Sequence, residues 1–558
     1  MRRLSFAVAL AAALLVTPHA ADLPGRPRLL VVLSVDQFRG DYVTLYGHQW
    51  SKGLKRLVDG GARFTQAAYP YFTTVTCAGH ATIGTGAFPA THGLPANSWL
   101  DRATGKTVSC TDDPGVSTVS YGRPSTALGH SAHALRNPSF GDELRAQGAG
   151  RPRVVTMSIK PRSAIMMAGH GGDLVLWHND GDGWASSTAF GREPVPFIAR
   201  FAADHPVARD SGATWDRLLP ASMYRFDDES RHEDTPAGWS STFPHVLPDV
   251  AKNPKEFYAL WEETPFSDAA LGRLAAEAVR GFRLGSAQGR TDYLGVSFSA
   301  LDYVGHDFGP RSHEVQDVLA RLDVTIGRLL DDIDRHVGRG HYTVVLTGDH
   351  GVAPIPEDAA EAGLDAGRMP ASEIVDTASR AIASVLGENK HVLKLAYIDL
   401  YLAPGVVDRL RETPGALRAV TQAIAAVRGV ERVLVGEDLA SRKGDGDPLV
   451  RAAALNYVAG RSGDLIVLPR PYWQNSTSGT THGTGYGYDQ RVPLVLFGAR
   501  VKPGTYDAAV TPADIAPTLA YLAGVTLART DGRPLAEALT HSSPASAPVA
   551  RPAAAATP

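Results

Sequence analysis

Two short segments, Asp302-Tyr303-Val304-Gly305-His306 and Thr347-Gly348-Asp349-His350-Gly351, decide the fold that we expect for this chain. Each segment places a carboxylate and an imidazole close together after an apolar run typical of a buried strand (residues 293–299 and 342–346). In open α/β sheets, ligand-binding residues lie at the carboxyl ends of the strands. The two segments therefore predict an α/β sheet with a polar site at one edge.

Two further residues have the same character. Asp36 follows the apolar run 29–35, and His482 lies within the Gly-rich stretch 479–487. Carboxylate oxygen and imidazole nitrogen together suit zinc or a similar divalent ion. Six such ligands suggest two metal ions rather than one, and they are Asp36, Asp302, His306, Asp349, His350 and His482.

The composition is that of an ordinary globular protein, with 558 residues, of which 44% are hydrophobic and 20% charged. A chain of this length can bury one large core or divide into two or three domains. The formal net charge is −3, so no overall basic character points to nucleic acid or to a membrane surface. We expect no nucleic-acid partner and no stable membrane association, and we expect a monomer.

The two ends of the chain differ from the rest. Two arginines precede the apolar run 4–16, and the small residues Ala20 and Ala21 follow it. This pattern predicts a cleaved secretory signal peptide over residues 1–21, with a retained anchor as the alternative, and hence a periplasmic or secreted protein. The Ala- and Pro-rich residues 542–558 are predicted to be disordered.

The chain has two cysteines, Cys77 and Cys110. In an oxidising compartment they could form one disulfide, but two unpaired thiols fit the sequence equally well. Neither cysteine belongs to a CxxC pattern, so the sequence does not favour a thiolate zinc site.

Strand-like runs alternate with helical patterns along the chain, which favours a three-layer α/β fold with a mostly parallel central sheet flanked by helices. The clearest helix is 313–336, where apolar residues recur every three or four positions. Further strands are expected at 154–158, 465–468 and 493–497. We expect one catalytic domain over residues 22–541, with large insertions at about 100–290 and 353–475 that cover the active site and are not separate domains.

A hydroxyl group follows the β-branched and aromatic run 71–75, in the segment Thr76-Cys77-Ala78-Gly79-His80. At the start of a helix, Thr76 would face backbone N–H groups and the positive end of the helix dipole. A threonine in this position is usually a helix cap, and only the metal ligands elsewhere make a nucleophile a reasonable alternative.

Taken together, these segments resemble the alkaline phosphatase superfamily, which includes zinc phosphatases, nucleotide pyrophosphatase/phosphodiesterases and sulfatases. The resemblance extends from about residue 29 to about residue 522 and includes the late segment 511–519. It implies one zinc ion held by Asp302, His306 and His482. It implies a second zinc held by Asp36, Asp349, His350 and the nucleophile Thr76.

Other residues discriminate between branches of this superfamily. Lys160 and Arg162 resemble the Lys-x-Arg element of the PafA-type alkaline phosphatases, the phosphate-irrepressible class with a Thr nucleophile. There this pair and the residue matching Asn97 hold the phosphate of a monoester, which carries one more negative charge than a diester. The resemblance therefore implies a zinc-dependent, exported alkaline phosphatase that hydrolyses small phosphate monoesters through a phosphothreonine at Thr76.

Two alternatives stay open. One is a phosphodiesterase or nucleotide pyrophosphatase, favoured if Lys160 and Arg162 turn away from the metals. The other is an exported zinc- or phosphate-binding protein without catalysis. We expect His80 and His92 to form structural hydrogen bonds. The acidic runs 227–229 and 445–447 could bind an additional Ca²⁺, but a solvated charge run is the simpler interpretation.

Overall fold

The computed structural model describes residues 25–122, 127–179 and 183–540. The signal peptide expected over residues 1–21 and the disordered tail expected over 542–558 lie outside the described residues. No helix of the described part is long and apolar enough to cross a membrane.

The centre of the molecule is a sheet of eleven strands, in the order β21-β2-β20-β13-β1-β12-β7-β8-β9-β5-β6. Its five middle strands are parallel. They are β13 (Tyr342–Gly348), β1 (Leu29–Val35), β12 (Asp292–Phe298), β7 (Val154–Ser158) and β8 (Leu174–Asn179). The prediction of a parallel sheet thus holds for the strands that end at the metal-ligand segments.

Antiparallel pairing begins on both sides of this parallel block, so the sheet as a whole is mixed. On one side β20 (Leu494–Gly498) runs antiparallel to β13 and to β2 (Ala62–Ala67), and β21 (Gly504–Val510) completes the edge. On the other side β9 (Gly183–Ser187) begins four residues after β8 ends, and so short a connection allows only antiparallel pairing. The strands β5 (Asp112–Ser120) and β6 (Leu128–His130) follow β9 at this edge.

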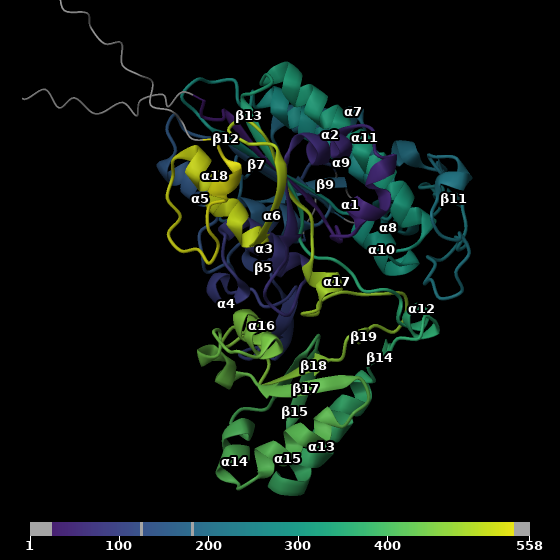
Figure 1. Cartoon of the computed structure of the whole chain (residues 1–558), viewed down its shortest axis with the longest axis vertical. Helices are drawn as coiled ribbons and strands as arrows, with labels where there is room; N and C mark the ends of the chain where they lie inside the picture. Colours follow the sequence, from purple (N-terminus) through teal and green to yellow (C-terminus); the bar gives the residue numbers. More distant parts are fainter. Residues whose placement is uncertain (1–24, 123–126, 180–182, 541–558) are drawn as a thin grey trace, which may run out of the picture.

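Helices cover both faces of the sheet, which gives the predicted three layers (Figure 1). Alternate residues of β1 point to opposite faces, as the pleat requires. Leu29, Val31, Leu33 and Val35 pack into the core below α9 (Pro265–Gly281) and α11 (His313–His336), and Leu30 and Val32 into the core below α5 (Phe140–Gln147) and α18 (Ile515–Ala523).

The helix predicted at 313–336 is α11, with the same bounds. The eight apolar positions that recur at this spacing are all buried: Val315, Val318, Leu319, Leu322, Ile326, Leu329, Leu330 and Ile333.

Residues 353–475 build a lobe with a sheet and a core of its own, at the bottom of Figure 1. The sheet has the order β15 (Val392–Ala396), β16 (Asp399–Leu402), β18 (Leu465–Pro469) and β17 (Val430–Val435). Against it pack α13 (Ala371–Leu386), α14 (Val406–Glu412) and α15 (Ala416–Ala425). The strand predicted at 465–468 therefore exists, but it belongs to this small sheet and not to the central one.

The span 100–290 is only partly an insertion, because β7, β8 and α9 within it belong to the central layers.

The other strands and α-helices of the described chain are α1 (Tyr42–Tyr46), α2 (Gly53–Gly60), α3 (Thr76–Thr85), α4 (Pro89–His92), β3 (Ser98–Asp101), β4 (Lys106–Ser109), α6 (Pro161–Ala168), α7 (Pro196–Asp204), β10 (Thr214–Trp215), β11 (His245–Val246), α8 (Pro254–Glu262), α10 (Ala300–Phe308), α12 (Pro356–Glu361), β14 (Gly367–Arg368), α16 (Pro448–Asn456), β19 (Trp473–Gln474) and α17 (Gly487–Gln490).

A glycine contact sets the distance between α3, which begins at Thr76, and α6, which begins directly after Lys160. A Cβ atom at Gly84 of α3 would lie 2.2 Å from the carbonyl oxygen of Met166 in α6. Only a residue without a side chain permits this approach. Glycine at 84, in the last turn of α3, therefore lets α3 pack directly on α6.

We expect Gly84→Ala to destabilise the protein by about 1–3 kcal/mol, the usual cost of overpacking a core. The reason is that a backbone carbonyl cannot move aside as a flexible side chain can. Denaturant unfolding measures the change. Gly444→Ala is the control, because a Cβ there meets nothing within 4 Å, and equal stability of the two variants would contradict the argument.

Candidate active site

Three buried aspartates lie together at the carboxyl ends of adjacent parallel strands. Val35 at the end of β1 pairs with Phe298 of β12 and with Gly348 of β13, so the three strands end at the same level. Asp36 and Asp349 follow β1 and β13 directly, and Asp302 lies in the first turn of α10, just beyond β12. The register of the sheet thus brings together carboxylates that are far apart in the sequence.

Three histidines present the same ring nitrogen to these carboxylates. The Nδ1–H groups of His306, His350 and His482 donate to backbone carbonyls, at 2.8 Å to Thr480, 3.0 Å to Gly351 and 2.8 Å to Thr74, respectively. A carbonyl only accepts, so these bonds put the proton on Nδ1 and leave Nε2 as the ligand atom. Metal-binding histidines are commonly oriented in this way.

All six predicted ligands lie in this one cluster. Nε2 of His306 and of His482 lie 3.3 Å and 3.5 Å from Asp302 Oδ1. Nε2 of His350 lies 3.2 Å from Asp36 Oδ1 and 3.3 Å from Asp349 Oδ2. The rings of His350 and His482 are stacked, with their centres 3.5 Å apart, so the ligands around Asp302 lie next to those around Asp36 and Asp349.

The donor set fits divalent metal ions. Two groups of three residues each have their ligand atoms within 4.8 Å of one another. One group is Asp302, His350 and His482, and the other is Asp36, Asp349 and His350. In the described part of the chain, Asp36 Oδ1 and Asp349 Oδ2 are buried and accept no hydrogen bond. Buried carboxylate oxygens without a donor are costly unless a cation neutralises them.

Gln37 connects the two ligand groups, and our reading of the sequence did not single it out. Its backbone N–H donates to Asp349 Oδ1 at 3.1 Å, and its side-chain amide donates to Asp302 Oδ1 at 2.8 Å. The backbone at Gln37 has a φ of 65°, which non-glycine residues rarely adopt. In the sequence, the position directly after Asp36 was the only indication that Gln37 belongs to the site.

The ammonium of Lys160 lies between two of the carboxylates. It donates to Asp36 Oδ2 at 2.7 Å and also to Asp302 Oδ2. Burial and Asp302 act to raise the pKa of Asp36, but Lys160 and His350 outweigh them and hold this pKa below its usual range. The pKa of Asp302 stays well below its usual value despite burial, because of the neighbouring Lys160 and His306.

A chain of buried polar groups supports Lys160. The ammonium lies 4.7 Å from the centre of the Tyr303 ring, and the Tyr303 hydroxyl donates to Glu262 Oε2 at 3.3 Å. The other oxygen of Glu262 lies 2.5 Å from His178 Nδ1. Tyr303 lies between the predicted ligands Asp302 and His306, but nothing in the sequence indicated that its ring faces a lysine.

Thr76 is the first residue of α3, as predicted, and it is buried next to the ligands. Its Oγ1 lies 3.4 Å from His350 Nε2. The imidazole of His80, one turn further along, contacts the Thr76 carbonyl at 2.9 Å, Asp349 Oδ2 at 3.2 Å and Ser297 Oγ at 2.8 Å. These contacts agree with the structural role that we predicted for His80.

His92 also forms structural contacts. Its Nε2 lies 3.3 Å from Thr82 Oγ1, and its Nδ1 accepts from the backbone N–H of Leu94 at 3.2 Å. Burial lowers the pKa of His92 to about 3, which keeps the ring neutral.

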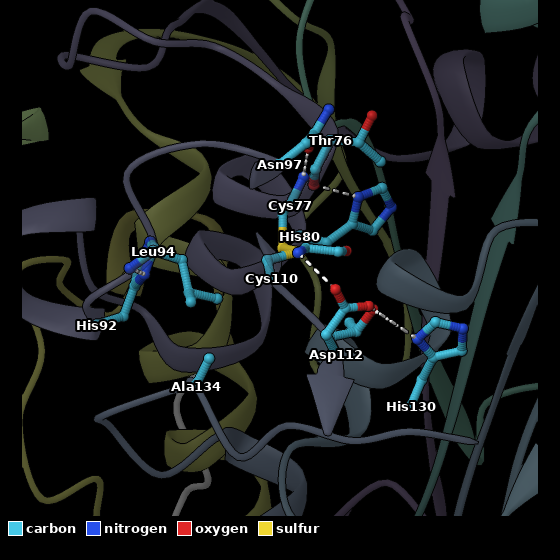
Figure 2. Close-up of a disulfide and its surroundings, with 12 residues drawn as sticks. Thr76, Cys77, His80, His92, Leu94, Asn97, Cys110, Asp112, His130 and Ala134 are labelled. Atoms are coloured by element: carbon cyan, nitrogen blue, oxygen red, sulfur yellow. Dashed lines mark hydrogen bonds and ion pairs between the residues drawn. A yellow bond between two sulfur atoms is a disulfide. The ribbon is translucent and has the colours of Figure 1, made fainter. Parts of the chain in front are cut away.

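Asn97 and Arg162 complete the set of predicted site residues. Asn97 Oδ1 accepts a hydrogen bond of 2.8 Å from the backbone N–H of Cys77, next to Thr76 (Figure 2). Arg162 lies in the first turn of α6 and is half-buried. Its Nε has no hydrogen-bond partner among the described residues.

A disulfide joins Cys77 and Cys110, which resolves the alternative left open by the sequence. The acidic runs are ion-paired: Asp228 with Arg217 and His313, and Asp445 and Asp447 with arginines 442 and 432. Neither run belongs to a group that could hold a metal in the described part of the chain. The structure therefore adds no support for a calcium site at these runs.

The family model for type I phosphodiesterase / nucleotide pyrophosphatase matches residues 30–489. The chain belongs to this family. A protein from Myroides odoratus named calcium-transporting ATPase is 31% identical over 532 residues, which cover 93% of this chain and 96% of that protein. Alkaline phosphatase PafA from Elizabethkingia meningoseptica is 30% identical over 515 residues, which cover 89% and 91%.

The crystal structure of wild-type PafA has the same fold, with a TM-score of 0.85 and 29% identity over 92% of this chain and 99% of that one. The resemblance to PafA-type alkaline phosphatases and the alkaline-phosphatase-like fold are thereby confirmed. The chain is a phosphatase-type hydrolase, and the alternative of a non-catalytic binding protein is set aside.

We expect Tyr303→Leu to lower phosphatase kcat/KM about tenfold, because a cation–π contact shielded from water contributes on the order of 1–2 kcal/mol. Tyr303→Phe keeps the ring and is expected to lose less than about threefold, since it loses only the bond to Glu262. Steady-state kinetics of both variants measures the difference. Equal losses would mean that the hydroxyl, and not the ring face, supports Lys160.

Proposed function

We propose that this protein is an exported alkaline phosphatase with two zinc ions, and that it hydrolyses small phosphate monoesters through a phosphothreonine at Thr76. One observation carries the proposal: the buried hydroxyl of Thr76 at the start of α3 lies 3.4 Å from Nε2 of His350, within a cluster that holds six candidate metal ligands and the ammonium of Lys160. Nucleophile, metal ligands and a buried cation are together what phosphoryl transfer from a dianion requires.

The zinc ions would lower the pKa of an oxygen nucleophile and neutralise charge on the leaving oxygen. The assignment of ligands is Asp302, His306 and His482 for one ion, and Asp36, Asp349, His350 and Thr76 for the other. The support for it is that the three histidines keep Nε2 for a metal, and that Asp36 and Asp349 each keep a carboxylate oxygen without a hydrogen bond in the described structure.

Thr76 acts as the nucleophile in this proposal. Its Oγ attacks phosphorus, the bond from phosphorus to the ester oxygen breaks, and the alcohol leaves. Water then attacks the phosphothreonine and releases inorganic phosphate. The N-terminus of α3 favours this chemistry, because the helix dipole stabilises negative charge there.

Lys160, Arg162 and Asn97 bind the substrate phosphate. A lysine has three N–H donors, and Asp36 and Asp302 use two of them, so one is left for a phosphate oxygen. Arg162 offers a guanidinium at the start of α6, and its Nε is unpaired in the described structure. A cation pair of this kind favours the dianionic monoester over the monoanionic diester.

Export is supported by the two features of the chain that depend on its compartment. Residues 1–21 have the sequence pattern of a secretory signal peptide. The disulfide between Cys77 and Cys110 suits an oxidising environment such as the periplasm.

A phosphodiesterase or nucleotide pyrophosphatase is the second candidate, because the description of the matching family names both activities. Rates on nitrophenyl phosphate and on bis-nitrophenyl phosphate separate the two candidates, with zinc-loaded protein and a chelator control. We expect a large monoester preference that the chelator removes. A diester preference would assign the protein to the second candidate.

We expect Lys160→Ala combined with Arg162→Ala to lower monoester kcat/KM by about 100-fold or more, since hydrogen bonds to charged groups contribute about 1.5–3 kcal/mol each. Diester hydrolysis should fall much less, because the diester carries one charge fewer. The same two substrates measure the effect, with the exposed Lys502→Ala as control. A proportional loss on both substrates would contradict the assigned role of the pair.

We expect Thr76→Ala to lower turnover by at least about 1,000-fold, because no other hydroxyl takes the place of the nucleophile. Thr76→Ser keeps a hydroxyl and should keep measurable activity. Mass spectrometry of acid-quenched protein should find phosphate on residue 76 in wild type and in the serine variant. Elemental analysis should find zinc largely retained in the alanine variant, because Asp36, Asp349 and His350 remain as ligands of that ion, and a loss of zinc would mean that Thr76 serves mainly to hold the metal.

A further inference from the structure

A closed ring of three links surrounds Asn97, next to the nucleophile. The first link is the hydrogen bond of 2.8 Å from the backbone N–H of Cys77 to Asn97 Oδ1. Cys77 lies in the first turn of α3, where backbone N–H groups have no carbonyl partner within the helix. Asn97 supplies that partner from a segment twenty residues away.

The second and third links run through Cys110. Its backbone N–H donates to the carbonyl of Asn97 at 2.9 Å, and its sulfur is bonded to that of Cys77. Asn97 and Cys110 directly flank the two-stranded ribbon of β3 and β4, in which Ser98 pairs with Ser109. Figure 2 shows Thr76, Asn97 and the disulfide together. The bridge therefore ties the open end of the ribbon to the start of α3.

The ring determines which way the Asn97 amide faces. Its oxygen is engaged by the helix backbone, so its NH₂ group, on the other branch of the same planar amide, points away from the Cys77 N–H. A rotation that exchanged oxygen and nitrogen would place N–H against N–H at Cys77 and would be unfavourable. The side chain thus keeps a donor available beside Thr76, where a phosphate oxygen lies in the proposed reaction.

We propose that the Cys77–Cys110 disulfide is a positioning element, which holds the Asn97 amide at the distance from Thr76 that phosphate binding requires. The inference rests on the proposed function of the site. Without the bridge, the open end of the ribbon is joined to the start of α3 by the hydrogen bond that Asn97 Oδ1 accepts from the Cys77 N–H. Donors displaced by about 1 Å can lower a rate up to about 100-fold.

The ribbon has other anchors, so the loss of the bridge is not expected to unfold it. Arg102 of the β3–β4 turn lies 3.1 Å from Asp464 of the small lobe. The side-chain amide of Asn456 donates to the carbonyl of Pro95 at 3.2 Å, two residues before Asn97. Both cysteines lie in an apolar cluster with Leu94 and Trp99. The expected effect is therefore local to Asn97.

The test is a double-mutant cycle between the bridge and Asn97. Cys110→Ala is made in the wild-type chain and in Asn97→Ala, and Cys77→Ala serves as a second way to remove the bridge. We expect Cys110→Ala to lower kcat/KM for nitrophenyl phosphate about tenfold in the wild-type chain, and less than about twofold when Asn97 is already alanine. Zinc content and the circular dichroism spectrum should not change.

A purely structural bridge would give a different result. Equal losses with and without Asn97, or a loss of zinc in the variants, would overturn the inference. If neither cysteine variant folds, reduction of the folded wild type and of Asn97→Ala with a phosphine gives the same comparison. Thiol titration then reports the bridge alone, because the chain has only two cysteines. A smaller loss on reduction in Asn97→Ala would support the inference, and an equal loss would overturn it.

The cycle also separates failure of this inference from failure of the proposed function. If Asn97→Ala in the oxidised protein leaves monoester hydrolysis unchanged, Asn97 does not bind the phosphate and its assigned role falls, and the inference falls with it. If Asn97→Ala lowers the rate at least about tenfold but the two changes are additive, the role of Asn97 stands and only the positioning role of the disulfide falls.

Discussion

Three carboxylates buried side by side are the feature on which the rest of this structure depends. Asp36 and Asp349 are fully buried and Asp302 almost so, and all three lie at the end of the parallel block of strands. Burying like charges together costs several kcal/mol for each ion unless cations compensate. The site therefore requires positive charge, from Lys160 and from metal ions, and the same positive charge suits it to a phosphate dianion.

Much of the surrounding structure holds these charges in place. Gln37 donates to both Asp349 and Asp302, and backbone carbonyls orient the three histidine rings. A Cβ atom at Gly79 would lie 2.2 Å from the carbonyl oxygen of Asp349, so α3 can approach β13 only with glycine there. This approach places Thr76 next to His350. The proposed nucleophile and the candidate metal ligands thus have fixed positions relative to one sheet.

The groups that we propose to contact the substrate come from outside the sheet. Lys160 and Arg162 lie at the start of α6, and the Lys160 ammonium rests on Tyr303 and, through it, on Glu262. Asn97 lies next to a two-stranded ribbon that a disulfide ties to α3. The sheet therefore supplies the candidate metal centre, and in the proposed function substrate selection depends on helix ends and added segments that can vary without disturbing it.

The sequence by itself determined the parallel core and the candidate ligands at its edge, because Asp36, Asp302 and Asp349 follow apolar runs whose burial is encoded locally. It also determined α11 to the residue, since 24 residues of helical periodicity leave little ambiguity. Only the tertiary structure decided that β20 and β9 reverse direction, that the strand at 465–468 joins a separate sheet, and that Cys77 pairs with Cys110. Only the tertiary structure also placed Gln37 and Tyr303 in the site. The hydrogen bond from Gln37 to Asp302, for example, joins residues 265 positions apart in the sequence. Periodicity reports that a face is buried, but not which distant element buries it.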